Sequence, residues 1–343
     1  MAKPYLAFLG EGTSAAQCKT AFGLRDWCRS DVIAQFALPG CSVDLGIPWM
    51  SPREAALRGA RSLVIGIAPI GGAIPETWWP VLFAALEAGL NIVSGMHAKL
   101  ATVPGLADAA AAGGRTLHDV RHSDRVFAVA TGQKRSGRRL LTVGTDCAIG
   151  KKYAALAITS ALGAKGIAAH FRATGQTGIL IAGGGVAIDA VAADFVAGAA
   201  ESLSPSNDPD HWDIVEGQGA LCHPAYAGVT LGLIHGTQPD ALVLCHDPAR
   251  THLESYPSYP IPDIGYVMNQ YIAAARLTNP QVRFVGIGLN TSNLSDAARK
   301  RLFSDLTTRF ALAAFDPIRD GGAVVAKMLV EEFSGEVHRE APN

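Results

Sequence analysis

The sequence predicts an α/β protein, with an N-terminal Rossmann-like domain over residues 1–130 and a P-loop NTPase-like domain with a parallel sheet over residues 131–343. Three observations support this fold class. The chain has 343 residues, a length typical of two domains. Apolar strand-like runs alternate with helical patterns, which is typical of parallel sheets covered on both faces. One strand runs into a glycine loop that ends in Gly150-Lys151 at the start of a helix.

Composition and charge exclude several classes of protein. The chain has 29 Lys and Arg against 30 Asp and Glu, so it lacks the basic excess with which proteins attract nucleic acid or anionic membranes. With 49% hydrophobic and 17% charged residues, it is too apolar for intrinsic disorder. The most apolar segment, residues 178–200, contains Asp189, Asp194 and several glycines, which argues against a membrane span.

Localisation and redox state follow from the same sequence. The apolar run near the N-terminus is too short for a signal peptide, so we expect a cytoplasmic protein without nucleic-acid or membrane partners. The six cysteines form no CxxC pair, which argues against a zinc ribbon or a redox-active dithiol. Because the chain is apolar and has few charged residues, we expect an apolar surface that is buried between subunits of a homo-oligomer.

In the N-terminal domain the pattern predicts a βαβ unit. The expected elements are strands at residues 5–9, 62–68 and 90–95 and a helix at residues 78–88. Glycine-rich turns follow the first two strands at residues 10–13 and 69–72, but neither has the full GxGxxG spacing. We therefore interpret these glycines as places of close backbone packing, in preference to a nucleotide site.

A basic stretch between His118 and Arg139 is interpreted as the connection between the domains. Its basic cluster, which either is a solvated linker or helps to hold an extra phosphate, consists of Lys134, Arg135, Arg138 and Arg139. The strands expected beyond it are residues 140–143, 168–171, 213–215, 241–245 and 282–287. The expected helices are residues 151–162, 187–198, 266–275, 296–310 and 317–333.

The strongest motif is the strand, glycine loop and helix at the start of the second domain, which predicts a site for the phosphates of a ligand. The residues expected to hold the phosphates are Gly144, Thr145, Asp146, Cys147, Ala148, Ile149, Gly150, Lys151 and Lys152. Backbone N–H groups of such a loop and the N-terminus of the helix attract an anion, and Lys151 adds a positive charge.

Two positions depart from the usual Walker A pattern. Thr145 stands where the first glycine is usual, so that the loop resembles that of the dethiobiotin synthetase-like branch of P-loop proteins. Lys152 replaces the Ser or Thr whose hydroxyl ligates Mg²⁺. Phosphoryl transfer depends on that metal, whereas coenzyme A needs only a place for its phosphates. The loop therefore favours acyl transfer over ATP-driven chemistry, and we expect no metal cofactor.

Polar clusters at the predicted strand ends supply candidate substrate-binding residues, since ligands bind at the carboxyl ends of parallel strands. They are Arg172, Thr174, Gln176, Thr177 and Gly219. Arg172 could pair with a substrate carboxylate or simply face solvent, and the turn at residues 174–178 could supply oxyanion donors. Asn290, which follows another strand, is a candidate for binding the adenine of the cofactor.

Three residues are candidates for acid–base chemistry. Glu216 stands at the end of a buried strand, where it could ligate a metal or act as the general base. His223 is a second candidate base, although a loop histidine is more often satisfied by its neighbours. Asp189 is either functional or the cap of a helix, and Asp194 is a weaker candidate because a spacing of five residues places it on another face of that helix.

The motifs together resemble a P-loop-fold family long described as a domain of unknown function, one branch of which is the D-glutamate N-acetyltransferases. The matching segments are residues 144–152, 174–178, 189, 194–195, 216–219 and 223–224, and more weakly residues 18–21 and 94–97. The resemblance covers nearly the whole chain. It implies transfer of the acetyl group of acetyl-CoA to the amino group of a D-amino acid, above all D-glutamate, in D-amino-acid catabolism.

The mechanism expected from this resemblance is direct attack of the deprotonated substrate amine on the thioester, with Glu216 or else His223 as the base. An acyl-cysteine route through Cys147 or Cys222 is less favoured. Two other functions remain alternatives. One is an ATP- and Mg²⁺-dependent kinase or ligase like dethiobiotin synthetase, and the other is a nucleotide-sensing regulator without catalysis.

Overall fold

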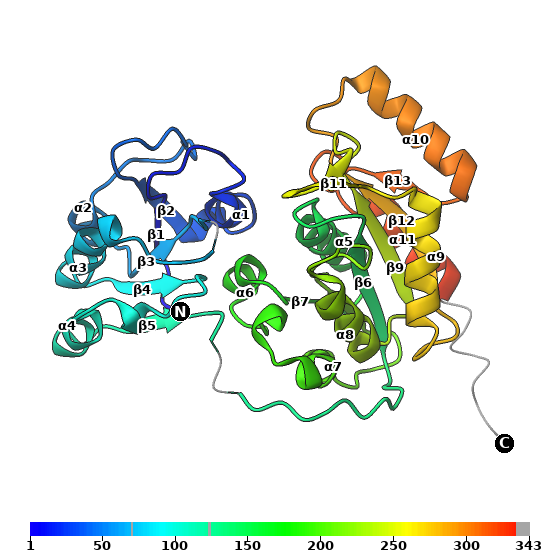
Figure 1. Ribbon diagram of the computed structural model, residues 1–343, viewed down its shortest axis with the longest axis horizontal. Coiled ribbons are helices and arrows are strands. Elements are labelled where there is room, and N and C mark those ends of the chain that lie inside the picture. The colour runs from blue at the N-terminus through cyan, green and yellow to red at the C-terminus, as the bar shows by residue number, and fades with distance from the viewer. Residues whose placement is uncertain (70, 123–124, 334–343) are drawn as a thin grey trace. The chain divides into compact units, whose positions relative to one another are not determined.

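The computed structural model describes residues 1–69, 71–122 and 125–333. The chain divides into two compact units, which Figure 1 colours by residue number. The first unit comprises Met1–Arg125 and Gly175–Ala190, and the second comprises Val126–Thr174 and Val191–Asn343. The sequence division assigned residues 175–190 to the second domain, whereas in the structure they pack with the first unit.

The first unit has a five-stranded parallel sheet in the order β2-β1-β3-β4-β5. Its strands are β1 Tyr5–Phe8, β2 Val32–Phe36, β3 Ser62–Ile65, β4 Asn91–Ser94 and β5 Leu117–Asp119. Its helices are α1 Lys19–Trp27, α2 Pro52–Leu57, α3 Trp79–Glu87, α4 Leu106–Ala112 and α6 Gln176–Ala182, with short 3₁₀ turns at Arg29–Asp31, Glu76–Trp78, Leu100–Thr102 and Ile188–Ala190. The helices α2, α3 and α4 cover one face of the sheet, and α1 and α6 pack on the other (Figure 1).

The second unit has a six-stranded parallel sheet in the order β13-β12-β9-β6-β8-β7. Its strands are β6 Arg138–Gly144, β7 Ala169–Arg172, β8 Trp212–Val215, β9 Ala241–His246, β12 Arg283–Leu289 and β13 Ala314–Phe315. Its helices are α5 Lys151–Ala164, α7 Val196–Leu203, α8 Ala227–Thr237, α9 Ile264–Ala275, α10 Asp296–Phe310 and α11 Ala323–Phe333. An antiparallel hairpin, β10 His252–Leu253 and β11 Tyr256–Pro260, follows β9.

The core of the second unit positions the phosphate loop. Leu140, Ile214 and Val243 come from the three central strands and pack with α5 and α11 in one apolar cluster. Strand β6 lies between β8 and β9, so its carboxyl end is buried on both sides. The sheet therefore holds the residues after β6 and β8 next to each other.

The predicted helix at residues 187–198 is wrong. The chain forms a 3₁₀ turn at Ile188–Ala190, a second at Ala193–Phe195, and only then helix α7. Ala192 is extended between the two turns, and at this point the chain passes from the first unit into the second. Asp189 and Asp194 consequently lie in separate turns and do not share a helix, so they do not have the helical spacing that was expected for them.

The basic cluster spans the start of β6, and its three arginines contact the second unit while Lys134 stays exposed. Arg139 is fully buried, and its guanidinium donates to backbone carbonyls that include those of Ser204 and Pro205. Arg135 donates to two carbonyls at the end of α8, and Lys134 pairs with Asp240. Arg138 lies over the rings of Trp212 and Phe333. These cations hold the segment before β6 against the body of the second unit.

The glycine turn after β1 agrees with the interpretation of close packing. A Cβ on Gly10, whose φ is +53°, would lie 2.9 Å from the ring of Trp78. That indole is buried and donates its Nε1–H to Glu11 at 2.7 Å. The glycine at this turn is therefore explained by its close contact with the Trp78 ring.

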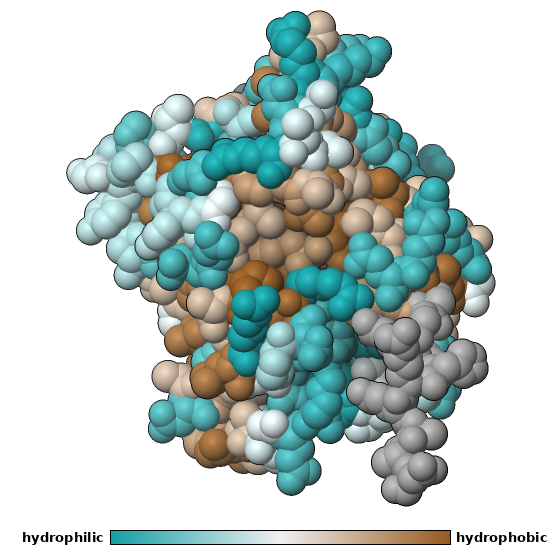
Figure 2. All heavy atoms as spheres, turned by 90° about the vertical axis from the view of Figure 1, so that its right-hand side faces the viewer, coloured by the Kyte–Doolittle hydropathy of each residue, from teal (hydrophilic) through white to brown (hydrophobic). Residues whose placement is uncertain are grey.

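The lengths of the helices and the exposed apolar side chains bear on membrane and protein partners. None of the helices in the described part of the chain combines the length and the apolar character that a membrane span requires. Figure 2 shows apolar side chains gathered in the middle of one face and surrounded by hydrophilic residues. Large apolar side chains that the second unit leaves exposed include Leu277, Ile318 and Val324.

Candidate active site

The phosphate loop, residues 144–152, connects β6 to α5, and its Lys151 side chain donates a hydrogen bond back to the loop backbone. Gly150, with a φ of +106°, adopts the left-handed conformation that starts the helix at Lys151. The Lys151 ammonium is buried and donates to the backbone carbonyl of Asp146 at 2.7 Å. Burial lowers the pKa of Lys151, against the opposing effect of nearby acidic groups. An anionic ligand in the loop would restore the missing solvation of this cation.

Asp146 is part of the loop's internal scaffold. It is fully buried, and its Oδ1 accepts the Cys147 N–H at 2.7 Å. Its Oδ2 accepts Arg250 Nη1 at 2.7 Å and the Glu254 N–H at 2.9 Å. Arg250 also donates to the carbonyl of Cys147 at 2.7 Å. Burial alone would lower the pKa of Arg250, but the bond to Asp146 and other carboxylates outweigh it and the pKa is raised.

Glu216 follows β8, directly beside the strand that leads into the loop. Its side chain is buried, and its Oε2 accepts the Thr174 N–H at 3.1 Å. The Thr174 hydroxyl donates to the Glu216 carbonyl at 2.5 Å. The next residue, Gly217, donates to the Thr142 hydroxyl, and a Cβ there would lie 1.7 Å from the Thr142 carbonyl. Only glycine permits this approach, which fixes Glu216 against the loop.

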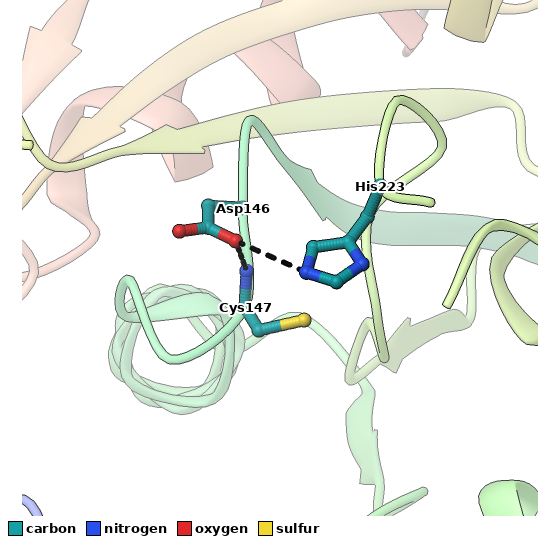
Figure 3. A group of neighbouring side chains, drawn as sticks. All are labelled: Asp146, Cys147 and His223. Carbon is teal, nitrogen blue, oxygen red and sulfur yellow. Dashed lines mark hydrogen bonds and ion pairs between the residues drawn. The ribbon is translucent and has the colours of Figure 1, made fainter. Parts of the chain in front are cut away.

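His223 lies across the loop from Asp146 (Figure 3). It is 2% exposed, its Nδ1 accepts the Ala225 N–H at 3.1 Å, and its Nε2 is 3.9 Å from Asp146 Oδ1. Within the described residues, Nε2 has no hydrogen-bond partner. Burial lowers the pKa of His223, Lys151 lowers it further, and Asp146 opposes both. The imidazole is therefore neutral at pH 7 and can accept a proton.

Asp146, Cys147 and His223 form a group with ligand atoms within 4.8 Å of one another, as metal ligands would be (Figure 3). The surroundings favour an anion over a divalent ion, because the Lys151 ammonium is buried in this loop and Lys152 stands beside it. The same positive charges favour a phosphate.

Tyr271 is a site residue that sequence analysis missed. Its hydroxyl comes from α9, donates to the Gly144 carbonyl at 2.8 Å and accepts the Leu221 N–H at 2.9 Å. Burial raises the pKa of this phenol well above its ordinary value. Tyr271 thus joins the start of the phosphate loop to the segment that carries Glu216 and His223. A tyrosine on an apolar helix gives no local signal of this role.

A cavity of about 130 Å³ opens beside the loop. Its lining includes the loop residues 148–150, Tyr153, Asn290 and residues 316–318. The Asn290 amide donates to Asp247 at 2.9 Å and accepts from the hydroxyl and N–H of Ser292. The cavity adjoins the loop, and the contact of Asn290 with adenine stays a prediction.

The substrate-binding candidates fall into both units of the structure. Arg172 lies in the second unit, where its Nε donates to the buried Asp213 at 2.7 Å. Thr174 uses its N–H and its hydroxyl on Glu216, so it positions that carboxylate and its N–H is already committed. Gly219 has a φ of +67°, and a Cβ there would lie 2.5 Å from the Thr230 hydroxyl, which identifies a tight turn.

Gln176, Thr177 and Asp189 belong to the first unit. Gln176 and Asp189 both accept from the guanidinium of the buried Arg121. The Thr177 hydroxyl bonds to that of Thr20 at 2.9 Å. Asp189 therefore has an ion-pair partner within its own unit, and the interpretation as a helix cap is wrong because no helix begins there.

Cys222 differs from an activated nucleophile. Cys222 is partly buried, and burial raises the pKa of its thiol. A raised pKa lowers the fraction of reactive thiolate. All six cysteines lie within the described residues, and none of them forms a disulfide there.

Comparison with known proteins gives the site a family context. Residues 128–326 match the P-loop domain, and residues 36–123 the Rossmann-like domain, of a family described as a domain of unknown function, DUF1611. A crystal structure of a DUF1611 family protein from Anabaena variabilis superposes with a TM-score of 0.87 at 35% identity, covering 96% of this chain and 100% of that one.

Two curated relatives carry a functional name. One from Tritonibacter scottomollicae, named D-glutamate N-acetyltransferase, is 48% identical over 318 residues, which are 93% of this chain and 96% of the relative. One from a Pseudoalteromonas species with the same name is 46% identical over 326 residues, which are 95% of this chain and 98% of the relative. The likeness extends over both units.

Proposed function

We propose, from the premise that this chain belongs to the DUF1611 family, that it is a D-glutamate N-acetyltransferase that uses acetyl-CoA in D-amino-acid catabolism. The observation that carries the proposal is the phosphate loop itself, which has a buried lysine for phosphate but Lys152 in place of the magnesium-binding hydroxyl. A thioester needs no γ-phosphate and no metal at that position. The predictions of an acetyl-CoA co-substrate and of no metal cofactor belong to this proposal.

Acetyl-CoA would bind with its diphosphate in residues 144–152. Lys151 and the N-terminus of α5 would neutralise the phosphates, and the adenine would enter the adjacent cavity beside Asn290. The thioester would then extend from the loop toward Glu216 and His223, which follow the neighbouring strand β8.

The acceptor must lose a proton before it can react, because D-glutamate carries an ammonium group at pH 7. Glu216 would take that proton, and the free amine would attack the thioester carbonyl. The C–S bond then breaks, the acetyl group stays on nitrogen, and the sulfur leaves with a proton returned to it. Thr174 holds Glu216 in place for this step.

His223 is the second candidate base. Its neutral imidazole directs Nε2 toward Asp146, whose carboxylate would stabilise the imidazolium that forms on protonation. Arg172 is a weaker candidate for the substrate carboxylate because Asp213 already occupies it.

The direct test is release of coenzyme A thiol from acetyl-CoA in the presence of D-glutamate, with L-glutamate and the enzyme-free mixture as controls. We expect thiol release with D-glutamate and unchanged rates in EDTA. Absence of thiol release with D-glutamate would contradict the proposal, and Mg²⁺-dependent ATP cleavage would favour the kinase or ligase alternative. Light scattering under the same conditions tests the prediction of a homo-oligomer.

A further inference from the structure

Two histidines and an aspartate converge at the edge of the second sheet, outside the phosphate loop. His170 and Asp213 are each the second residue of their strands, β7 and β8, and they are paired in register. Side chains at paired positions of neighbouring strands share a face of the sheet. His211 precedes Asp213 by two residues and so projects to the same side.

The neighbouring positions confirm which face this is. Trp212 and Ile214 alternate with Asp213 along β8, and both enter the apolar cluster that α5 and α11 cover. The cluster of His170, His211 and Asp213 therefore occupies the opposite face. It also lies near the amino ends of the strands, whereas the phosphate loop follows the carboxyl end of β6.

Two of the separations between the three potential ligand atoms are close to those in a tetrahedral metal site. His211 Nε2 is 3.2 Å from His170 Nδ1 and 3.2 Å from Asp213 Oδ1, and all three atoms lie within 4.8 Å of one another. Zinc bonds of about 2.0–2.1 Å in tetrahedral geometry separate ligand atoms by about 3.3 Å. The cluster thus needs little rearrangement to bind an ion.

Hydrogen bonds between these three side chains cannot satisfy all of their facing atoms at once. Nε2 of a neutral His211 can carry one proton, which serves either Asp213 or His170, and not both at full strength. A cation on the two nitrogen lone pairs and the carboxylate would satisfy all three atoms at once. Imidazole and carboxylate are the ligands that zinc takes in proteins.

Arginine side chains lie next to the carboxylate of Asp213. Arg172 Nε donates to Asp213 Oδ1 at 2.7 Å, a bond that the oxygen can keep while it ligates a metal through another lone pair. Arg139 lies beside Asp213 in the register of β6 and β8 and donates to backbone carbonyls, and both Arg139 and Arg135 interact electrostatically with this carboxylate. His170 is exposed, which leaves a fourth position open to water.

We propose that His170, His211 and Asp213 bind one Zn²⁺, with water as the fourth ligand. The ion would cross-link the edge strand β7 to β8 and to the segment before it. The cluster lies at the amino ends of the strands and not in the phosphate loop, so the expected effect of the ion is on stability.

The test uses the full chain, stripped with EDTA and titrated with Zn²⁺ alone, with bound metal measured after dialysis. We expect one equivalent of zinc and a rise in the melting temperature. His170→Ala, which alters an exposed side chain, should lose that equivalent and that rise while keeping the metal-free melting temperature and the acetyl transfer rate. His252→Ala is the matched control at another exposed histidine and should behave as the wild type. Zinc binding that persists in His170→Ala, or no binding by the wild type, would overturn the proposal.

Cobalt distinguishes this site from the group of Asp146, Cys147 and His223. Co²⁺ bound by nitrogen and oxygen gives visible ligand-field bands without the near-ultraviolet charge-transfer band of a cobalt thiolate. We expect only the former. A thiolate band that disappears in Cys147→Ser would place the metal in the phosphate loop and refute the assignment to β7 and β8.

Discussion

Replacement of Tyr271 by Phe tests whether α9 holds the phosphate loop. The ring of phenylalanine fills the same space, so the change removes the hydroxyl without creating a cavity. Two backbone groups then lose their partner, the buried Gly144 carbonyl at 2.8 Å and the part-buried Leu221 N–H at 2.9 Å, of which the second costs less. Each such group costs about 1–3 kcal/mol when it is left unsatisfied. We therefore expect the free energy of unfolding to fall by about 2–4 kcal/mol.

The assay is urea unfolding followed by circular dichroism, together with titration of acetyl-CoA. Tyr259→Phe is the matched control, because Tyr259 lies in the hairpin strand β11 and is 50% exposed. Its loss of a hydroxyl should change stability by less than about 0.5 kcal/mol. Acetyl-CoA binding should weaken in Tyr271→Phe and not in the control. Equal stabilities for the two variants would refute the reasoning that Tyr271 bridges the two segments.

Three further predictions concern the loop and the candidate bases. Glu216→Gln should lower kcat by about 100-fold or more and leave the Kd for acetyl-CoA unchanged, which turnover and calorimetry would show; retained turnover would exclude Glu216 as the base. Lys151→Ala should weaken acetyl-CoA binding by about 10- to 100-fold, since a charge-assisted hydrogen bond contributes about 1.5–3 kcal/mol, and an unchanged Kd would remove the loop from the binding site. Because burial lowers the pKa of His223 below its ordinary value of 6.5, its contribution to stability is complete above that pH and is lost as the pH falls through the lower value of the folded state. Melting temperatures between pH 5 and 8 should therefore fall less in acid for His223→Asn than for the wild type, and parallel curves would contradict this.

The sequence predicted the strand, glycine loop and helix because they are local, while phosphate binding by the loop stays a prediction. A strand, a glycine loop and a helix are consecutive, and their residue types alone indicate an anion site. Tyr271 and Arg250 could not be found in this way. They reach the loop from 127 and 104 positions along the chain, through α9 and the segment after β9. Their types, an aromatic residue on a helix and an arginine in a loop, are common on any surface.

The failed helix at residues 187–198 has a different physical cause. The apolar pattern there is compatible with a helix, but Asp189 pairs with Arg121 in the first unit while Val196 is buried in the second. A chain that belongs to two bodies within seven residues must be extended between them. Local propensity is then overridden by contacts that the sequence does not show.

On the proposed function, the charges around the loop would take the place of the usual magnesium ion. Asp146, the acidic residue within the loop, is neutralised by Arg250, and both are held by backbone bonds. Lys151 remains as the buried cation that a phosphate would meet, and Lys152 adds a second cation beside it. A diphosphate thus finds its compensating charge in the protein. In an ATPase the protein and a bound metal ion together neutralise the phosphates, and the metal also stabilises the γ-phosphate during its transfer. We infer that this loop evolved for a ligand whose phosphates stay in place while the chemistry occurs at its other end.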